Sequence, residues 1–468
     1  MNHRLASAAP TRADHRAVHR NNLEVVLRHL GTVGPDSRAG IATRVGLTPS
    51  TVSRLVAELL DLGLVREVAD APSSDTPRPG RPAIQLELDG RHILALGAEI
   101  SVDRITVIGT DLAGTVVYHR DRVFDAARSG PEATAAAVGR LCTRAVDTVV
   151  RKSPAHVTLA GLAVAVPGLV EVETGVVTEA PNLYWRGFPF GKVLAEVSDL
   201  PPEAIVLGND ANFAALAEYR IGSRAGTPNL IYITGEVGIG GGVIAAGQGL
   251  LGSHGHGGEI GHMKLDPKGA RCGCGRRGCW EALIGLDALL REAGLDDEPT
   301  PPQGRRSART AGAPARATGR GPRQWSASTR AARVAERARA GDKRTLAALE
   351  TLARWVGIGA ANLVNIFDPQ VIILGGYFRH VAEWILPTAR QVMVEGVLAP
   401  DAGGCELAIS SLGFEAAARG AALHMIDQVI ADPARLAVQA YPKWGVPGPA
   451  RQRDRARRRV SEPRAASP

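Results

Sequence analysis

The sequence lacks the features of a secreted or membrane-spanning protein. It contains no run of about 18 uninterrupted apolar residues, and a helix needs a run of that length to cross a bilayer. The first 20 residues carry several Arg and His side chains and include no apolar segment of the kind found in a secretory signal. We therefore expect a cytoplasmic protein with no membrane partner.

Cysteine is also scarce, with five residues in a chain of 468, and three of the five lie between Cys272 and Cys279. In a reducing compartment, such a tight cluster favours metal binding over disulfide bonding. Cys142 and Cys405 stand apart from the cluster, in segments that read as a helix and a strand. We expect both to be inert core residues.

Most of the chain has no excess of positive charge, although the net charge is +8. Two stretches rich in Pro, Arg and Ala, 301–330 and 443–468, carry net charges of +7 and +6, so the rest of the chain carries −5. Such compositions have too few apolar residues to form a core, which predicts a disordered insertion at 301–330 and a disordered basic tail at 440–468. The basicity alone is weak support for nucleic-acid binding, which has to come from a motif.

Residues 16–70 have the pattern of a winged helix-turn-helix domain. Three short helices are predicted by apolar residues at helical spacing, and Ser37 and Thr48 stand at the N-cap positions of the second and third. Gly46 turns the chain between these two helices, and 64–68 fits a β-wing. This arrangement is typical of DNA-binding domains, with a three-helix interaction domain as the alternative. The predicted buried residues are Leu23, Val26, Leu27, Leu30, Ile41, Ala42, Val45, Val52, Leu55, Val56 and Leu59.

The third helix and the linker that follows at 71–83 carry the side chains expected to meet DNA. Hydroxyl groups near a helix N-terminus can approach phosphates and base edges, and an arginine can reach either. Prolines extend the linker around Arg78 and Arg81, so these side chains can enter a minor groove, although a stiff linker is the alternative. The expected DNA-binding residues are Thr48, Ser50, Thr51, Ser53, Arg54, Arg78 and Arg81.

From Ile84 to Asp432 the pattern is that of an α/β domain. Three early strands, a helix and a further strand are followed later by the same arrangement, which predicts two related lobes. The strands are expected at 93–96, 105–108, 116–118, 159–166, 204–207, 230–234, 243–246 and 371–374, and the helices at 131–151, 211–219, 283–293 and 346–366.

A metal site is predicted by Cys272, Cys274 and Cys279, with His262 ten residues upstream of the first cysteine. Three thiolates and one imidazole make the closed set of four ligands that suits structural Zn²⁺. The alternative is a loop with three free thiols.

Two further segments are candidates for ligand contact. Asn209 and Asp210 stand where a strand ends and a helix begins, which is where α/β folds place ligand-binding side chains. A carboxylate there can bind a sugar hydroxyl or accept its proton, and capping of the helix is the alternative. The glycines from Gly238 to Gly242 can bring backbone N–H groups close to a phosphate, and a tightly packed hairpin explains them equally well.

These motifs together resemble the ROK family of repressors, open reading frames and sugar kinases. The resemblance rests on four strings: Ala180-Pro181-Asn182-Leu183, Gly208-Asn209-Asp210-Ala211-Asn212, Gly257-Gly258-Glu259-Ile260-Gly261-His262 and the cysteine run that ends at Glu281. The helix-turn-helix and Gly80-Arg81-Pro82 resemble the regulator branch of the family, which the xylose and N-acetylglucosamine repressors typify.

The resemblance implies an actin-like, hexokinase-like fold whose two lobes bind a sugar in the cleft between them, at 84–432. It implies that Asp210 matches the catalytic base of the kinases, and that His262 both binds zinc and faces the sugar. The matching sugar-contacting positions are Asn182, Asn209, Asp210, Glu259, His262 and Glu281.

The nucleotide half of the family pattern is altered in this chain. Kinases of the family begin their first lobe with an Asp-x-Gly-Gly-Thr turn, and the matching residues here are Glu99-Ile100-Ser101-Val102-Asp103. A carboxylate at Glu99 would repel phosphate oxygens unless a cation intervenes. Val237 also replaces the Thr that precedes the second glycine-rich loop.

The sequence therefore predicts a DNA-binding transcriptional regulator that senses a sugar or sugar derivative, and a repressor is the favoured type. No enzyme activity is expected. The expected partners are operator DNA and the sugar, in a homodimer or homotetramer with structural Zn²⁺. Lobe closure would re-pose the DNA-binding domains, and a ligand that prefers the DNA-bound arrangement would instead make an activator or a corepressor-dependent repressor. The rival is an ATP-dependent sugar kinase with an appended DNA-binding domain, in which Asp210 would be catalytic.

Overall fold

The structure, a computed structural model, describes residues 15–68, 84–153, 157–236, 238–253, 255–295, 326–399, 404–434 and 436. The predicted linker at 71–83, with Arg78 and Arg81, the predicted tail at 440–468 and residues 301–325 of the predicted insertion lie outside the described residues. Within the described part of the chain, no helix is long and apolar enough to cross a membrane.

The N-terminal domain consists of three helices and a small sheet. Ser37 and Thr48 cap α2 and α3 through their side chains, as predicted, because each hydroxyl accepts a backbone N–H of the first helical turn. Gly46 ends α2 in the left-handed conformation, at φ 71°. The predicted apolar residues are buried except Val45, which is half-buried. The helices are α1 (His15–Val33), α2 (Arg38–Val45) and α3 (Pro49–Asp61).

The wing extends further along the chain than predicted. Its sheet has the order β1-β3-β2, formed by β1 (Asp36–Ser37), β2 (Val65–Val68) and β3 (Gln85–Leu88). The predicted domain boundary at residue 84 places β3 in the sugar-binding domain, but β3 pairs antiparallel with both other strands, and Leu86 is fully buried in the N-terminal core. The partner of β2 lies beyond the linker, and local pattern cannot reveal a pairing across that distance.

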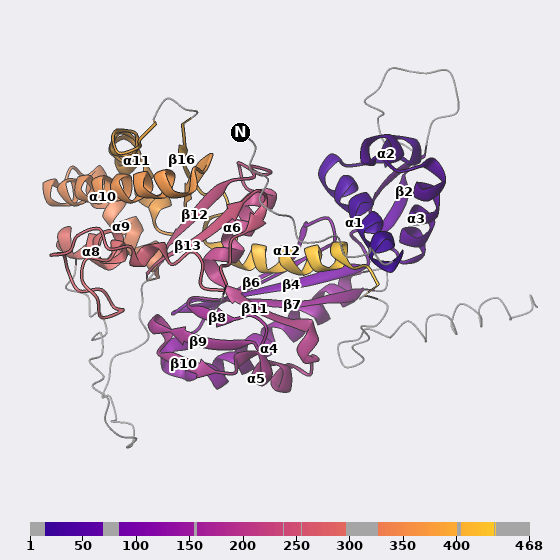
Figure 1. The fold of residues 1–468 in the computed structure, drawn as a ribbon. Coiled ribbons are helices and arrows are strands. Elements are labelled where there is room, and N and C mark those ends of the chain that lie inside the picture. Colours follow the sequence, from indigo (N-terminus) through magenta and orange to yellow (C-terminus); the bar gives the residue numbers. More distant parts are fainter. Residues whose placement is uncertain are drawn as a thin grey trace, which may run out of the picture.

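Two lobes with the same strand order form the rest of the protein (Figure 1). The first sheet has the order β11-β7-β4-β5-β6 and the second the order β16-β15-β12-β13-β14, so each places an antiparallel hairpin beside parallel strands. The prediction of two related lobes is confirmed. The strands are β4 (Ile93–Ile100), β5 (Arg104–Thr110), β6 (Val116–Val123), β7 (Thr158–Val166), β11 (Ile205–Asn209), β12 (Leu230–Gly235), β13 (Ile239–Ala245), β14 (Gln248–Gly249), β15 (Val371–Leu374) and β16 (Glu406–Ile409).

Helices cover both sheets, and they include all four that the sequence predicted. The helices are α4 (Ala126–Lys152), α5 (Phe190–Ser198), α6 (Asp210–Ile221), α7 (Trp280–Ile284), α8 (Leu286–Glu292), α9 (Ala327–Arg339), α10 (Lys343–Phe367), α11 (Phe378–Glu395) and α12 (Ala416–Ala431). The sequence analysis does not predict α5, α11 or α12. It also does not predict a three-stranded sheet of β8 (Leu169–Glu171), β9 (Val176–Ala180) and β10 (Trp185–Phe188).

Two local predictions need correction. The insertion expected at 301–330 ends earlier, because Ser326 caps α9, and Arg330 within that helix pairs with Asp287. Cys405 precedes β16 instead of lying in a strand and is half-buried, whereas Cys142 is fully buried in α4, as expected.

Candidate functional site

The predicted sugar-binding residues lie on segments that meet between the two lobes. Asn182 comes from the first lobe, and Asn209 and Asp210 lie where β11 ends and α6 begins. Glu259 and His262 flank a short 3₁₀ helix, η3 (Ile260–His262), and Glu281 lies in α7.

The turn before β13 brings Asn182 and Glu281 together. A Cβ atom at Gly238 would lie 2.5 Å from Oε2 of Glu281 and 3.3 Å from Nδ2 of Asn182, so both side chains reach this turn. The backbone N–H of Ile239 donates to Oε2 of Glu281 over 3.0 Å. A residue of the first lobe and one of the second therefore flank the same turn, as a ligand held between the lobes would require.

Asp210 is half-buried at the start of α6, and its Oδ1 accepts the backbone N–H of Ala211 over 2.9 Å. Removal from water raises the pKa of Asp210 to about 7, and the carboxylates of Glu236 and Glu259 contribute to this rise. A carboxyl group that titrates near neutral pH can bind a sugar hydroxyl in either protonation state and can accept its proton.

Asn209 is committed to local structure. Its Oδ1 accepts the N–H of Asn212 and caps α6, while its Nδ2 donates to the carbonyl of Gly168 over 3.1 Å. The capping alternative is confirmed for Asn209, and its contact with sugar stays a prediction.

The predicted metal ligands form a compact cluster. One donor atom from each of His262, Cys272, Cys274 and Cys279 can be chosen so that all four lie within 4.8 Å of one another. The sulfurs of Cys274 and Cys279 are 3.7 Å apart, and Nδ1 of His262 is 3.8 Å from Sγ of Cys272. Sulfurs bound at about 2.3 Å to a tetrahedral zinc lie about 3.8 Å apart, so the donor set fits Zn²⁺.

His262 connects this cluster with the sugar-binding residues. Its Nδ1 faces Cys272, and its Nε2 lies 3.9 Å from Oε2 of Glu259. The two ring nitrogens therefore face the metal cluster and the interlobe region respectively. A metal bound to Nδ1 would fix the ring that supports Glu259.

The turn between β4 and β5 contains a charge cluster that the sequence did not predict. Glu99 is buried, and the guanidinium of Arg104 donates to it over 3.2 Å and to Glu236 of the second lobe over 3.0 Å. Ser101 also donates to Glu236, over 2.9 Å, and the Arg104 guanidinium lies over the ring of Phe414. The sequence did offer one signal for this cluster. Arg104 and Glu236 are charged residues of opposite sign, and each stands next to a turn that binds phosphate in the kinases.

Glu99 has a cation beside it in this cluster. We expected Glu99 to repel phosphate, but Arg104 supplies a neighbouring cation that offsets its charge. Burial nevertheless raises the pKa of Glu99 to about 8, and its Oε2 has no hydrogen-bond partner. Ser101 and Arg104 of the first lobe and Glu236 of the second therefore form a hydrogen-bonded contact between the two turns.

The glycines after Gly238 serve the packing of a hairpin. In β13, a Cβ atom at Gly242 would lie 2.3 Å from the carbonyl oxygen of Ala211, and one at Gly241 would lie 2.5 Å from the side chain of Ile260. The hairpin interpretation of these glycines is confirmed, and contact with phosphate is not needed to explain them. Val237 lies outside the described residues.

The third helix of the N-terminal domain presents a polar face to solvent. Thr48, Ser50, Ser53 and Arg54 are exposed, and Thr51 is half-buried. Thr48 is occupied as the cap of α3, where its Oγ1 also contacts the hydroxyls of Ser50 and Thr51. Within the described residues Arg54 has no ion-pair partner, so its charge is available for a phosphate or base.

Comparison with known proteins agrees with this architecture. The model of the ROK family matches residues 95–428, and that of the MarR family matches residues 25–73. The chain belongs to the ROK family. Its N-terminal domain is a MarR-type helix-turn-helix domain, and its two lobes have the actin-like fold of ROK sugar kinases.

The similar proteins include regulators and kinases of the ROK family. The chain is 29% identical to a xylose repressor of Bacillus subtilis, over 89% of this chain and 98% of the repressor. It is 26% identical to the DNA-binding transcriptional dual regulator NagC of Escherichia coli, over 78% of this chain and 82% of NagC. It is 30% identical to a glucokinase of Streptomyces coelicolor, over 63% of this chain and 87% of the glucokinase.

Two solved structures show the same fold. A ROK family transcriptional regulator, a homologue of the E. coli Mlc protein, aligns with a TM-score of 0.68 at 24% identity, over 89% of this chain and 97% of that chain. A ROK family glucokinase from Streptomyces griseus, in complex with glucose and AMPPNP, aligns with a TM-score of 0.53 at 27% identity, over 71% and 98%. The similarity to the regulator extends over more of this chain than the similarity to the kinase.

Proposed function

We propose that the protein is a sugar-responsive transcriptional repressor that binds operator DNA through α3. The observation that carries this proposal is the pairing of Arg104 with Glu236 across the lobes, beside an interlobe set of polar residues suited to sugar. The chain keeps the side chains that would hold a sugar, while an ion pair of its own joins the two turns at which the kinases would bind phosphate. The xylose repressor and NagC, both similar over most of this chain, support the same conclusion.

The sugar ligands in this proposal are Asn182, Asp210, Glu259, His262 and Glu281, with Asn209 as a further candidate. Zn²⁺ held by His262 and the three cysteines would supply structural rigidity to the loop that bears Glu259, and it would take no part in chemistry. Each protein chain would bind one half of an operator as part of a homodimer, because helix-turn-helix proteins read paired half-sites. Sugar binding would close the lobes and shift the DNA-binding domains out of the spacing that the operator requires.

Two measurements test the proposal. A thermal-shift screen against D-xylose, D-glucose, N-acetylglucosamine and their phosphates should give a concentration-dependent rise in melting temperature for one of them, because a ligand that binds only the folded state stabilises it. A mobility-shift assay with DNA from upstream of the gene should show specific binding that the same sugar weakens. Binding that ignores every sugar, or no binding to DNA at all, would contradict the proposal.

A kinase with an appended DNA-binding domain is the second candidate, and Asp210 is the observation that favours it. An assay coupled to ADP release, run with ATP, Mg²⁺ and the sugar found in the screen, separates the two functions. We expect no turnover above background. Robust turnover that Asp210→Asn abolishes would replace the repressor proposal with an enzyme.

A further inference from the structure

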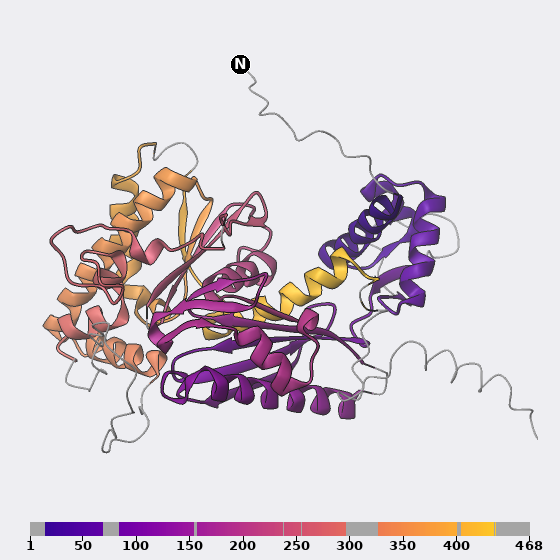
Figure 2. The ribbon, with the colours of Figure 1, turned by 60° about the horizontal axis from the view of Figure 1, so that its bottom comes forward.

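One helix, α12, spans the distance between the interlobe site and the DNA-binding domain (Figures 1 and 2). At its N-terminal end, Phe414, Ala416 and Ala417 line a small cavity together with Glu99 and Asp210. At its C-terminal end, α12 lies against α1, and among the described elements of the lobes it makes the most extensive contact with the DNA-binding domain. A displacement of α12 at one end therefore reaches the other.

The packing around α12 leaves little room for independent movement. A Cβ atom at Gly420 would lie 1.7 Å from the carbonyl oxygen of Phe213 in α6, and one at Gly97 would lie 2.0 Å from the carbonyl oxygen of Ala418. The backbones of α12, α6 and β4 thus touch directly, with no flexible side chain between them. Close-packed elements of this kind shift as units because the interior has no space to absorb a displacement.

Ion pairs join α12 and the residue that follows it to two neighbouring helices, α6 and α1. Asp427 of α12 pairs with Arg220, near the end of α6, and lies 3.7 Å from Arg28 of α1. Asp432, just after α12, lies 4.0 Å from Arg20 of α1. Helix α6 begins at Asp210, in the interlobe site, and Arg220 near its other end pairs with Asp427. Asp427 also faces Arg28 of the DNA-binding domain.

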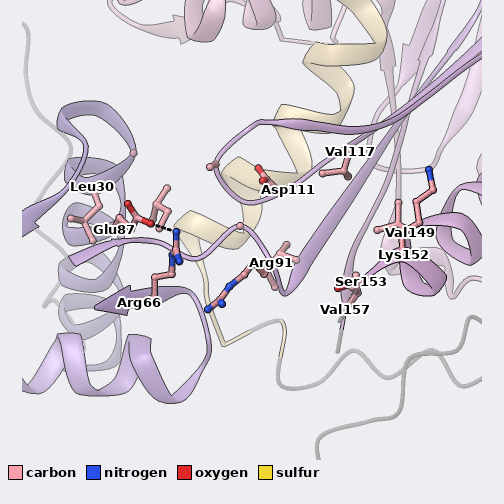
Figure 3. Close-up of a pocket in the computed structure, with 15 residues that line it drawn as sticks. Leu30, Arg66, Glu87, Arg91, Asp111, Val117, Val149, Lys152, Ser153 and Val157 are labelled. Carbon is pink, nitrogen blue, oxygen red and sulfur yellow. Dashed lines mark ion pairs between the residues drawn. The ribbon is translucent and has the colours of Figure 1, made fainter. Parts of the chain in front are cut away.

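Apolar contact reinforces the junction between α1 and α12. The DNA-binding domain is packed closely on this side, and a groove lies beside it. Leu23 and Leu27 of α1 belong to the same buried cluster as Val429 and Ile430 of α12. Beside this contact, a groove of about 560 Å³ separates the DNA-binding domain from the first lobe (Figure 3). Leu30, Arg66 and Glu87 line it from the DNA-binding domain, and Asp111, Val149 and Lys152 line it from the lobe. The DNA-binding domain thus has room to tilt about α12.

We propose that Asp427 is a positioning residue that couples sugar occupancy to the orientation of the DNA-binding domain, through its pairs with Arg220 and Arg28. The inference rests on the proposed function, because it specifies how the sugar signal reaches α1. When the lobes move, α6 and α12 shift together, and the carboxylate of Asp427 carries that shift to Arg28. Asp427 touches neither the sugar site nor the DNA-binding face of α3.

The coupling factor is the measurement that tests this proposal. It is the ratio of the operator Kd with and without a saturating sugar, either D-xylose or D-glucose, whichever raises the melting temperature. We expect a wild-type factor of about 10 or more. In Asp427→Asn, which weakens both ion pairs, we expect the factor to fall to within about twofold of one. Arg28→Met removes the pair with Asp427 and also the pair with Glu24, and it leaves the Asp427–Arg220 pair in place, so we expect a loss of about threefold.

Glu24→Gln is the matched control, because Glu24 is the other partner of Arg28 and lies within α1 itself. We expect this variant to keep the wild-type coupling factor, and all three variants to keep the wild-type affinity for sugar. Wild-type coupling in both Asp427→Asn and Arg28→Met would overturn the inference, and Arg28→Met alone decides it if Asp427→Asn fails to fold. If the wild-type protein binds sugar and operator without any coupling, the proposed function itself fails.

Discussion

The guanidinium of Arg104 donates a hydrogen bond to Oε1 of Glu236 over 3.0 Å, and this contact joins the first turn of one lobe to the first turn of the other. The same guanidinium pairs with Glu99, so one cation serves two carboxylates removed from water. The proximity of these acids raises the pKa of Arg104 above its usual value, which keeps it charged at every accessible pH. An internal ion pair therefore bridges the two lobes.

Loss of Arg104 should destabilise the protein. In Arg104→Met, Glu99 and Glu236 lose their common cation in a poorly hydrated site, and we expect the free energy of unfolding to fall by about 2–3 kcal/mol in urea denaturation. The double variant Arg104→Met/Glu236→Gln should recover part of this loss, because one uncompensated charge is gone. Equal stability of Arg104→Met and the wild type would mean that the ion pair does not hold the lobes together.

Stability should depend on pH through Asp210. An acid whose pKa rises from 3.8 to about 7 on folding binds more protons in the folded state than in the unfolded state between these values. The contribution of Asp210 to stability therefore falls as pH rises through this range. We expect Asp210→Asn to be more stable than the wild type at pH 8, by about 1–2 kcal/mol, and to lose most of this advantage at pH 4.

Thermal unfolding across this pH range measures the effect of Asp210. The exposed residue Asp147 provides the control, since Asp147→Asn should follow the wild-type profile at every pH. An advantage of Asp210→Asn that does not change with pH would show that removal of the carboxylate charge is not its cause.

Removal of the metal should affect both stability and sugar binding. In Cys274→Ser, or after chelation, the loop that carries Glu259 and His262 loses its anchor, and we expect the melting temperature to fall by about 5 °C or more. Sugar affinity should fall with it, as measured by isothermal titration calorimetry, whereas Cys405→Ser, far from the cluster in sequence, should change neither. Unchanged sugar affinity in protein whose metal loss has been verified would refute the structural role.

Gly97 tests the contact between the first lobe and α12. Because a Cβ atom there would lie 2.0 Å from the carbonyl oxygen of Ala418 and 2.5 Å from the backbone nitrogen of Ala422, Gly97→Ala must displace α12. We expect a loss of about 2–3 kcal/mol in urea denaturation. A Cβ atom at Gly249 would meet only the side chain of Leu251, at an ordinary contact distance of 3.9 Å, so Gly249→Ala should be neutral. A neutral Gly97→Ala would show that α12 moves easily.

Arg54 is expected to contact DNA directly. Arg54→Ala should weaken operator binding by about 1–3 kcal/mol, and the slope of log Kd against log salt concentration should fall by about one if the side chain meets a phosphate. Fluorescence anisotropy over a range of salt concentrations measures both quantities. Arg339→Ala, on α9 of the second lobe, should leave them unchanged, and an Arg54→Ala variant with wild-type affinity would exclude α3 as the main DNA contact.

Much of the candidate site could be predicted from short strings of sequence. The four predicted metal ligands lie within eighteen residues, from His262 to Cys279, so short chain segments can bring them close. The caps at Ser37, Thr48 and Asn209 depend on the three or four residues after each. These features are local. Local hydrogen bonds and ligand clusters can be predicted from a sequence because few alternative partners are within reach.

Contacts between residues far apart in the chain could not be predicted in this way. Arg104 and Glu236 are 132 residues apart, and neither segment contains a sequence pattern that predicts its pairing with the other. The strand β3 looked like the start of the next domain because its partner β2 lies across the linker. Helix α12 also went unnoticed, since its small and apolar residues face neighbours on almost every side and leave no amphipathic period.

The sequence by itself determined the two kinds of domain, the His/Cys cluster that could bind a metal and the polar residues proposed to bind sugar, because each depends on residue types at short spacing. Only the tertiary structure decided that Arg104 and Glu236 pair across the lobes and that α12 connects that region with α1. The physical reason is that packing and ion pairing between distant segments depend on where the two sheets place their ends, and residue spacing along the chain does not encode that placement directly.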